Sequence, residues 1–140
     1  MDWWFLVISD SIETLSELQS RFSHIPEAKS INLQNESILN ALVRLDSLTQ
    51  VELPRCIMID IDLGSIPGLA AIKTIRTRVA LSNIPIVALL PKSFSKKPKD
   101  FAPIIKEVQD DYQCLVLRHP IAQMSLEQVL TKLKNYPYYQ

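Results

Sequence analysis

The sequence predicts an α/β fold: a doubly wound, five-stranded parallel sheet in one domain spanning residues 1–140. Three observations support this prediction. Short apolar runs alternate along the chain with segments whose apolar residues recur at helical spacing. Cys56–Ile59 is apolar throughout, as a central parallel strand covered on both faces should be. The composition, with 47% hydrophobic and 21% charged residues, is that of an ordinary globular protein.

The predicted strands are short runs rich in apolar, β-branched or aromatic residues, because such side chains pack well on a pleated surface. In chain order they are Trp3–Ile8, a weaker strand around Ala28–Leu33, Cys56–Ile59, Ile84–Leu90 and a last strand anchored by Leu115–Leu117. The predicted helices are segments whose apolar residues recur about every three or four positions and so share one face. They are Ser11–Phe22 with Asp10 or Ser11 as N-cap, Glu36–Leu48, a third helix carrying Leu69, Ile72, Ile75 and Val79, and Met124–Lys134.

The segment between the fourth and fifth strands breaks this pattern. It contains Pro91, Pro98 and Pro103. A proline inside a helix removes a hydrogen bond and clashes with the preceding turn. We therefore expect an irregular segment in place of a regular fourth helix, with helical structure starting late, at Pro103 as its first residue.

A cluster of basic residues lies in the same segment, and its members are Lys92, Lys96, Lys97 and Lys99. Such a cluster is either a solvated loop or a surface that contacts an anion or an acidic partner.

The aromatic residues near the end of the chain, Tyr136, Tyr138 and Tyr139, also have two interpretations. They either anchor an interface or cover the last helix.

Charge and composition argue against several classes of protein. Lys+Arg and Asp+Glu both count 15, whereas a dedicated nucleic-acid binder normally carries a basic excess. Two glycines cannot supply a phosphate-cradling loop for a nucleotide. The apolar N-terminus is too short to span a bilayer, and Cys56 and Cys114 lie in apolar runs, as buried thiols do. We expect a soluble, cytoplasmic protein that binds neither nucleic acid nor membrane.

The turn after the third predicted strand is the most informative feature. Asp60 and Asp62 end the strand, and the turn that follows uses Gly64 and Gly68, the only glycines of the chain. Glycine permits φ > 0 and close approach of other groups. Two carboxylates at a strand end suit a hard cation such as Mg²⁺ or a phosphoryl-accepting carboxylate. The alternative is a plain strand-to-helix turn with Asp62 as an exposed turn former.

Ligands of a doubly wound sheet bind beyond the carboxyl ends of its strands, where Asp10, Asp60, Asp62, Leu90 and His119-Pro120 are expected to meet. Together with the stretch IMIDIDLGSIPGLAAIKTIRTRVALSNIPIVALL, this arrangement resembles the receiver domain of two-component response regulators over nearly the whole chain. The resemblance implies a flavodoxin-like (CheY-like) sheet with strand order 2-1-3-4-5.

The resemblance also implies roles for single residues. Asp60 matches the phosphoacceptor, and Gly68 matches the turn glycine that follows it. Ser9 and Asp10 match the metal-binding acidic pair, and Asp62 takes the position whose backbone carbonyl helps hold Mg²⁺. Leu90 stands at the position of the switch hydroxyl, and His119-Pro120 matches the lysine–proline pair whose peptide bond is usually cis. Any metal would therefore be held at Asp10, Asp60 and Asp62.

The chain departs from the family at three of these positions. Ser9 removes one negative charge and should weaken Mg²⁺ binding. We therefore expect a protein that requires no cofactor and binds Mg²⁺ weakly if at all. Leu90 cannot hydrogen-bond a phosphoryl oxygen, and the next residue, Pro91, has no N–H to offer. His119 is shorter than lysine and mostly neutral at pH 7, while strand alternation points Arg118 away. Together these changes indicate a pseudo-receiver.

The leading hypothesis is a stand-alone, non-enzymatic pseudo-receiver that signals by protein–protein contact, without ordinary aspartyl phosphorylation. Its partner would be a histidine kinase or a regulator acting in trans, and the neutral charge permits a weak homodimer. The alternative is a divergent single-domain response regulator phosphorylated at Asp60, with His119 or a lysine of the 92–99 loop supplying positive charge.

A third hypothesis is an enzyme. Asp60-Ile61-Asp62 is similar to the nucleophile motif of haloacid-dehalogenase-type phosphatases. Gly64 stands where that motif has threonine or valine, and here the motif falls in mid-chain. We therefore do not expect phosphatase activity.

Overall fold

The computed structural model describes residues 4–63, 66–78, 81–92, 96 and 98–135. It contains a five-stranded parallel sheet of order β2-β1-β3-β6-β7, which confirms the predicted order. The sheet strands are β1 (Trp4–Ile8), β2 (Asn32–Glu36), β3 (Cys56–Asp60), β6 (Ile86–Leu90) and β7 (Leu115–Arg118). The helices are α1 (Ile12–Ser23), α2 (Ile38–Ser47), α3 (Gly68–Thr77), α4 (Pro98–Asp110) and α5 (Gln123–Lys134).

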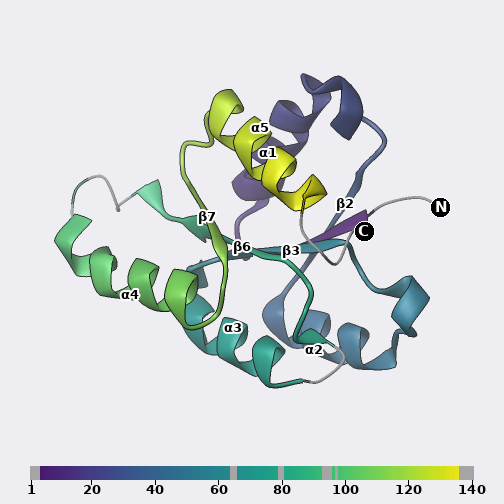
Figure 1. The fold of residues 1–140 in the computed structure, drawn as a ribbon, viewed down its shortest axis with the longest axis vertical. Coiled ribbons are helices and arrows are strands. Elements are labelled where there is room, and N and C mark those ends of the chain that lie inside the picture. Colours follow the sequence, from purple (N-terminus) through teal and green to yellow (C-terminus); the bar gives the residue numbers. More distant parts are fainter. Residues whose placement is uncertain (1–3, 64–65, 79–80, 93–95, 97, 136–140) are drawn as a thin grey trace.

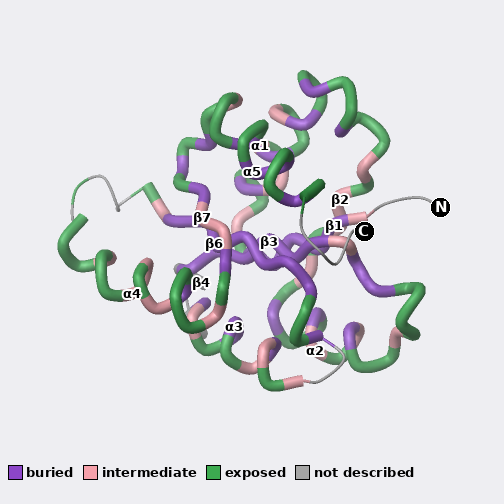
Figure 2. Tube along the Cα trace, in the orientation of Figure 1, coloured by how far each residue is buried: buried purple, intermediate pink, exposed green. Residues whose placement is uncertain are grey.

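Helices cover both faces of the sheet, with α1 and α5 on one face and α2, α3 and α4 on the other (Figure 1). Strand alternation explains the two cores: Leu6 and Ile8 of β1 belong to the cluster under α2 to α4, and Phe5 and Val7 to the cluster under α1 and α5. The central strands β3 and β6 are buried at every position, as Figure 2 shows for the middle of the molecule. This is the predicted doubly wound arrangement.

The predicted helical faces are confirmed at both ends of the chain. On α1, Leu18 and Phe22 are buried, and the Phe22 ring meets Phe5 edge-on with centroids 5.9 Å apart. Ser11 is the N-cap residue of α1, with an extended backbone and no capping hydrogen bond from its side chain. On α5, all four residues of the apolar stripe are buried: Leu126, Val129, Leu130 and Leu133. These stripes hold the two helices on one face of the sheet.

The prediction of an irregular segment in place of the fourth helix is wrong. α4 begins at Pro98, where the missing N–H is harmless because first-turn N–H groups have no partner in the helix. Pro103, predicted as the first helical residue, lies inside α4. Ile104 and Ile105 pack against the core and Val108 is fully buried, so tertiary packing offsets the one bond that Pro103 removes.

Smaller differences occur at the edge of the sheet. β2 begins at Asn32, later than the predicted Ala28–Leu33, because Pro26–Ala28 forms a short 3₁₀ turn first. An additional two-stranded hairpin joins Asp62–Leu63 (β4) to Ile66–Pro67 (β5) after β3. The predicted positions Trp3 and Val79 lie outside the described residues.

Both cysteines are free and buried, as predicted. Burial raises the pKa of the Cys114 thiol to about 11 and raises that of Cys56 further still. These thiols are therefore protonated core residues. Among the helices of the described residues, none has the length and apolar character needed to cross a membrane.

Candidate functional site

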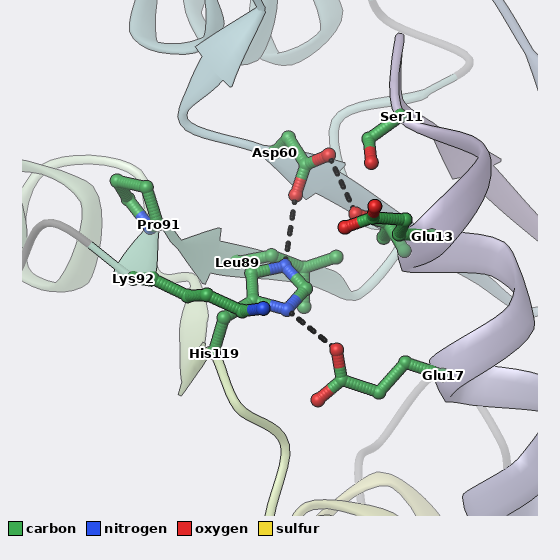
Figure 3. A pocket seen from close by; sticks show the side chains of 9 residues that line it. Ser11, Glu13, Glu17, Asp60, Leu89, Pro91, Lys92 and His119 are labelled. Atoms are coloured by element: carbon green, nitrogen blue, oxygen red, sulfur yellow. Dashed lines mark hydrogen bonds and ion pairs between the residues drawn. The ribbon is translucent and has the colours of Figure 1, made fainter.

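The candidate site lies where the carboxyl ends of β3, β6 and β7 meet the start of α1 (Figures 1 and 3). A pocket of about 240 Å³ opens there. Its lining residues are Ser11, Glu13, Thr14, Glu17, Asp60, Leu89, Pro91, Lys92 and His119. Three of them carry a carboxylate and only Lys92 and His119 can carry a positive charge, so acidic groups dominate the described wall.

Asp60 is the last residue of β3 and is only 8% exposed. Its Oδ2 accepts hydrogen bonds from the hydroxyls of Ser9 and Thr14, the latter at 3.2 Å. Its Oδ1 lies 3.3 Å from Nε2 of His119 (Figure 3). Both carboxylate oxygens are therefore engaged by protein groups, as a buried carboxylate requires.

Ser9 does more than remove an acidic ligand. It is buried directly after β1, which pairs with β3, so its side chain reaches the end of β3. Its hydroxyl donates to Asp60 while its oxygen accepts the backbone N–H of Ser11 at 3.0 Å. Ser9, which should weaken a metal site, thus helps Thr14 and His119 to stabilise the Asp60 carboxylate.

His119 follows β7 and lies between two carboxylates. Its Nε2 faces Asp60, and its Nδ1 is 3.2 Å from Oε2 of Glu17. The hydrogen bond to Asp60 raises the pKa of His119 above its ordinary value, and Glu17 adds to this, while burial opposes both. Only the imidazolium can donate to both carboxylates at once. The expectation of a mostly neutral His119 omitted these partners.

The stability that His119 contributes is expected to be lost as the pH rises. Its pKa is raised in the folded protein relative to the unfolded value of about 6.5. The contribution is therefore complete below that value and disappears as the pH rises through the folded-state pKa. Urea unfolding of wild type and His119→Gln between about pH 6 and pH 9 measures the difference in their free energies of unfolding. The difference in unfolding free energy between wild type and His119→Gln should shrink as the pH rises, and His24→Gln, at an exposed histidine, controls for loss of a histidine as such. A pH-independent difference would contradict the assignment.

Glu17 was not anticipated from the sequence. It lies one turn after Thr14 on α1, so both side chains face the site. Its Oε2 contacts His119, and its Oε1 accepts the backbone N–H of Ile121, two residues further along. The only signal in the sequence was the i, i+3 spacing of Thr14 and Glu17, which equally suits a solvated helix face.

The other predicted residues are distributed around this site. Asp10 is exposed and does not line the pocket, and Leu90 is buried in the core. Lys92 points into the pocket, while Lys96 and Lys99 are exposed outside it. The His119-Pro120 peptide bond is cis, as the resemblance implies. Lys97, Gly64 and the side chain of Asp62 lie outside the described residues.

The described side chains do not fit a magnesium site. Mg²⁺ requires several oxygen ligands in near-octahedral array. Ser9 donates its hydroxyl proton to Asp60, and both oxygens of Asp60 already accept protein hydrogen bonds or face His119. Within the part of the chain that the structure describes, no three His, Cys, Asp or Glu side chains are grouped so as to hold a metal ion.

Gly68 opens α3 directly beside Asp60. Its N–H donates to the carbonyl of Ile61 at 2.8 Å. A Cβ at this position would lie 2.6 Å from Cα of Ile61, 2.7 Å from its carbonyl oxygen, and closer still to the carbonyl oxygen of Asp60. All three are backbone atoms, so this position requires glycine for close approach, as the sequence predicted.

Comparisons with known proteins identify the fold. No protein-family model and no curated protein sequence matches the chain. Solved structures do match, and the chain is similar to the signal receiver domain of an HD domain-containing protein from Pseudomonas fluorescens Pf-5, at 15% identity and a TM-score of 0.70 over 96% of this chain and 88% of that one. It is also similar to a response regulator receiver protein from Pseudomonas putida (15%, TM-score 0.67, 94% and 98%).

A third similar structure is the chemotaxis response regulator CheY4 of Vibrio cholerae, at 17% identity and a TM-score of 0.63 over 95% of this chain and 99% of that one. At these identities the likeness establishes the fold, which is that of response regulator receiver domains.

Proposed function

We propose that this receiver-fold chain is a non-enzymatic signalling module that binds a protein partner and does not depend on phosphorylation of Asp60. One observation carries the proposal. The carboxylate of Asp60 is enclosed by Ser9, Thr14 and His119, which occupy both of its oxygens. A carboxylate held in this way is a structural anion rather than a free nucleophile.

The charges around the pocket support the same conclusion. Phosphoryl transfer needs cationic groups that neutralise charge developing on the phosphoryl oxygens. Glu13 and Glu17 line the same pocket as Asp60, so a phosphoryl group that approaches Asp60 would meet two further carboxylates beside Lys92 and His119. The buried Leu90 offers no hydroxyl to read such a group.

A divergent, phosphorylated response regulator is the second candidate, and a specific observation favours it. His119 lies 3.3 Å from Asp60, and Lys92 lines the same pocket. The sequence predicts that His119 or a lysine of the 92–99 loop supplies the positive charge of the usual lysine, and Lys92 belongs to that loop. In this case His119 would have to exchange Asp60 for a phosphoryl oxygen.

The partner would be a histidine kinase or a regulator that responds in trans, and weak self-association is compatible with the zero net charge. Lys96 precedes α4 and Lys99 lies in its first turn, and both are exposed, at the side of the molecule where the fold carries α4, β7 and α5. An acidic partner surface would complement these lysines.

Incubation with acetyl phosphate and Mg²⁺ is expected to leave the intact mass of the protein unchanged, because Asp60 is not free to attack. An ordinary receiver domain in the same tube serves as the positive control, and Asp60→Asn as the negative one. A phosphoryl adduct on wild type that is absent from Asp60→Asn would overturn the proposal and establish the second candidate. The partner search would then start from histidine kinases.

A further inference from the structure

The carboxylate of Glu17 joins two parts of the molecule. Oε2 contacts Nδ1 of His119 at 3.2 Å, and Oε1 accepts the backbone N–H of Ile121. These two groups lie on either side of Pro120, in the loop that leads from β7 to α5. One side chain of α1 thus contacts the loop at both His119 and Ile121.

The loop is connected to Asp60 through the same histidine. His119 presents one ring nitrogen to Asp60 on β3 and the other to Glu17 on α1 (Figure 3). The imidazole ring is rigid. If Asp60 moves and Nε2 of His119 moves with it, Nδ1, which faces Glu17, must therefore move as well. The side chains of Asp60 and His119 are 11% and 9% exposed, so little water could replace the contact between them if it were broken.

We propose that Glu17 is a positioning residue that couples the state of Asp60 to the loop preceding α5. The coupling runs from Asp60 through the His119 ring to the Glu17 carboxylate and on to the Ile121 amide. A partner seated on α5 would thereby sense what happens at Asp60, and the reverse holds by thermodynamic linkage. This inference deepens the proposed function, on which it rests for the role of the Asp60 site.

Glu13 provides a matched control. It lies on α1 and lines the same pocket, but it is exposed at the start of the helix. A general effect of removing negative charge from the pocket should appear with Glu13→Gln as well as with Glu17→Gln. An effect that passes through the two contacts of Glu17 should appear with Glu17→Gln alone.

A double-mutant cycle read by NMR tests the coupling. Asp60→Asn removes the charge that His119 faces while keeping the shape of the side chain. In wild type and in Glu13→Gln, this change is expected to alter the hydrogen-exchange rate of the Ile121 amide by about fivefold, the size of an ordinary coupling within one network. In Glu17→Gln, which retains an acceptor for Ile121, the same change should alter the rate by less than about twofold.

Two results would overturn the inference: the same response to Asp60→Asn in Glu17→Gln as in wild type, or no response in wild type. The Glu17→Gln substitution conserves shape, and the spectrum itself reports whether each variant is folded. The measurement uses neither a partner nor a phosphoryl donor. A phosphoryl adduct on Asp60 would therefore contradict the proposed function but not this coupling. A double-mutant cycle without the expected coupling would contradict the coupling but not the proposed function.

Discussion

Gly68→Ala is expected to lower the free energy of unfolding by about 3 kcal/mol or more, because the new methyl group must displace backbone. The clashing atoms are the carbonyl oxygen of Asp60 and the Cα and carbonyl oxygen of Ile61. None of them can rotate away as a flexible side chain would. The backbone of Asp60 and Ile61 must therefore shift relative to the start of α3, and Asp60 carries the carboxylate of the site. Chemical denaturation monitored by circular dichroism measures the loss.

Thr74→Ala is the control for this prediction. It adds no volume, lies on the same helix, and removes a hydroxyl that bonds to the carbonyl of Ala70 within α3. Its effect should stay within about 0.5 kcal/mol. A Gly68→Ala protein as stable as this control would show that the turn can relax without cost, contrary to the packing described here.

His119→Leu is the second large effect, with an expected loss of about 3 kcal/mol at neutral pH. The substitution removes the imidazole that contacts both Asp60 and Glu17 and leaves these two carboxylates, whose side chains are 11% and 23% exposed, without that partner. Neither carboxylate can recover full hydration at that depth. The free energy of unfolding from urea titration provides the measurement.

The origin of that loss can be tested in the same background. If stranded charge is the cause, Asp60→Asn should restore part of the stability of His119→Leu, although it weakens wild type. If Asp60→Asn lowers stability equally in both backgrounds, the loss reflects packing of the ring rather than the charge. The exposed His24→Leu variant controls for loss of a histidine as such.

The fold could be predicted from the sequence because its signals are local. Within the described residues, apolar runs and helical spacing predicted the five strands of the main sheet and the helices α1, α2, α3 and α5. The fourth helix, α4, begins at Pro98, five residues before the predicted start at Pro103, because a proline is a helix breaker only by its local effect. Its stability comes from Ile104, Ile105 and Val108, whose partners lie elsewhere in the chain.

The site could be predicted only in part. Positions at strand ends, such as Ser9, Asp60 and His119, were found because the topology of a parallel sheet brings them together. The role of Glu17 depends on which side of α1 faces the loop after β7, which residue spacing alone does not specify. The raised pKa of His119 comes first from its hydrogen bond to Asp60 and then from Glu17, and the contribution of Glu17 could not be predicted from residue spacing.

The separations along the chain within this site bear on how the protein folds. Ser9 and Asp60 are 51 residues apart, and Glu17 and His119 are 102 apart. Closing loops of this length costs more entropy than forming any neighbouring β–α unit, so these contacts are poor members of a folding nucleus. During synthesis, a chain that has emerged only as far as β6 contains Asp60 but not the histidine that neutralises it. Completion of this network therefore marks the moment at which the C-terminal strand has docked.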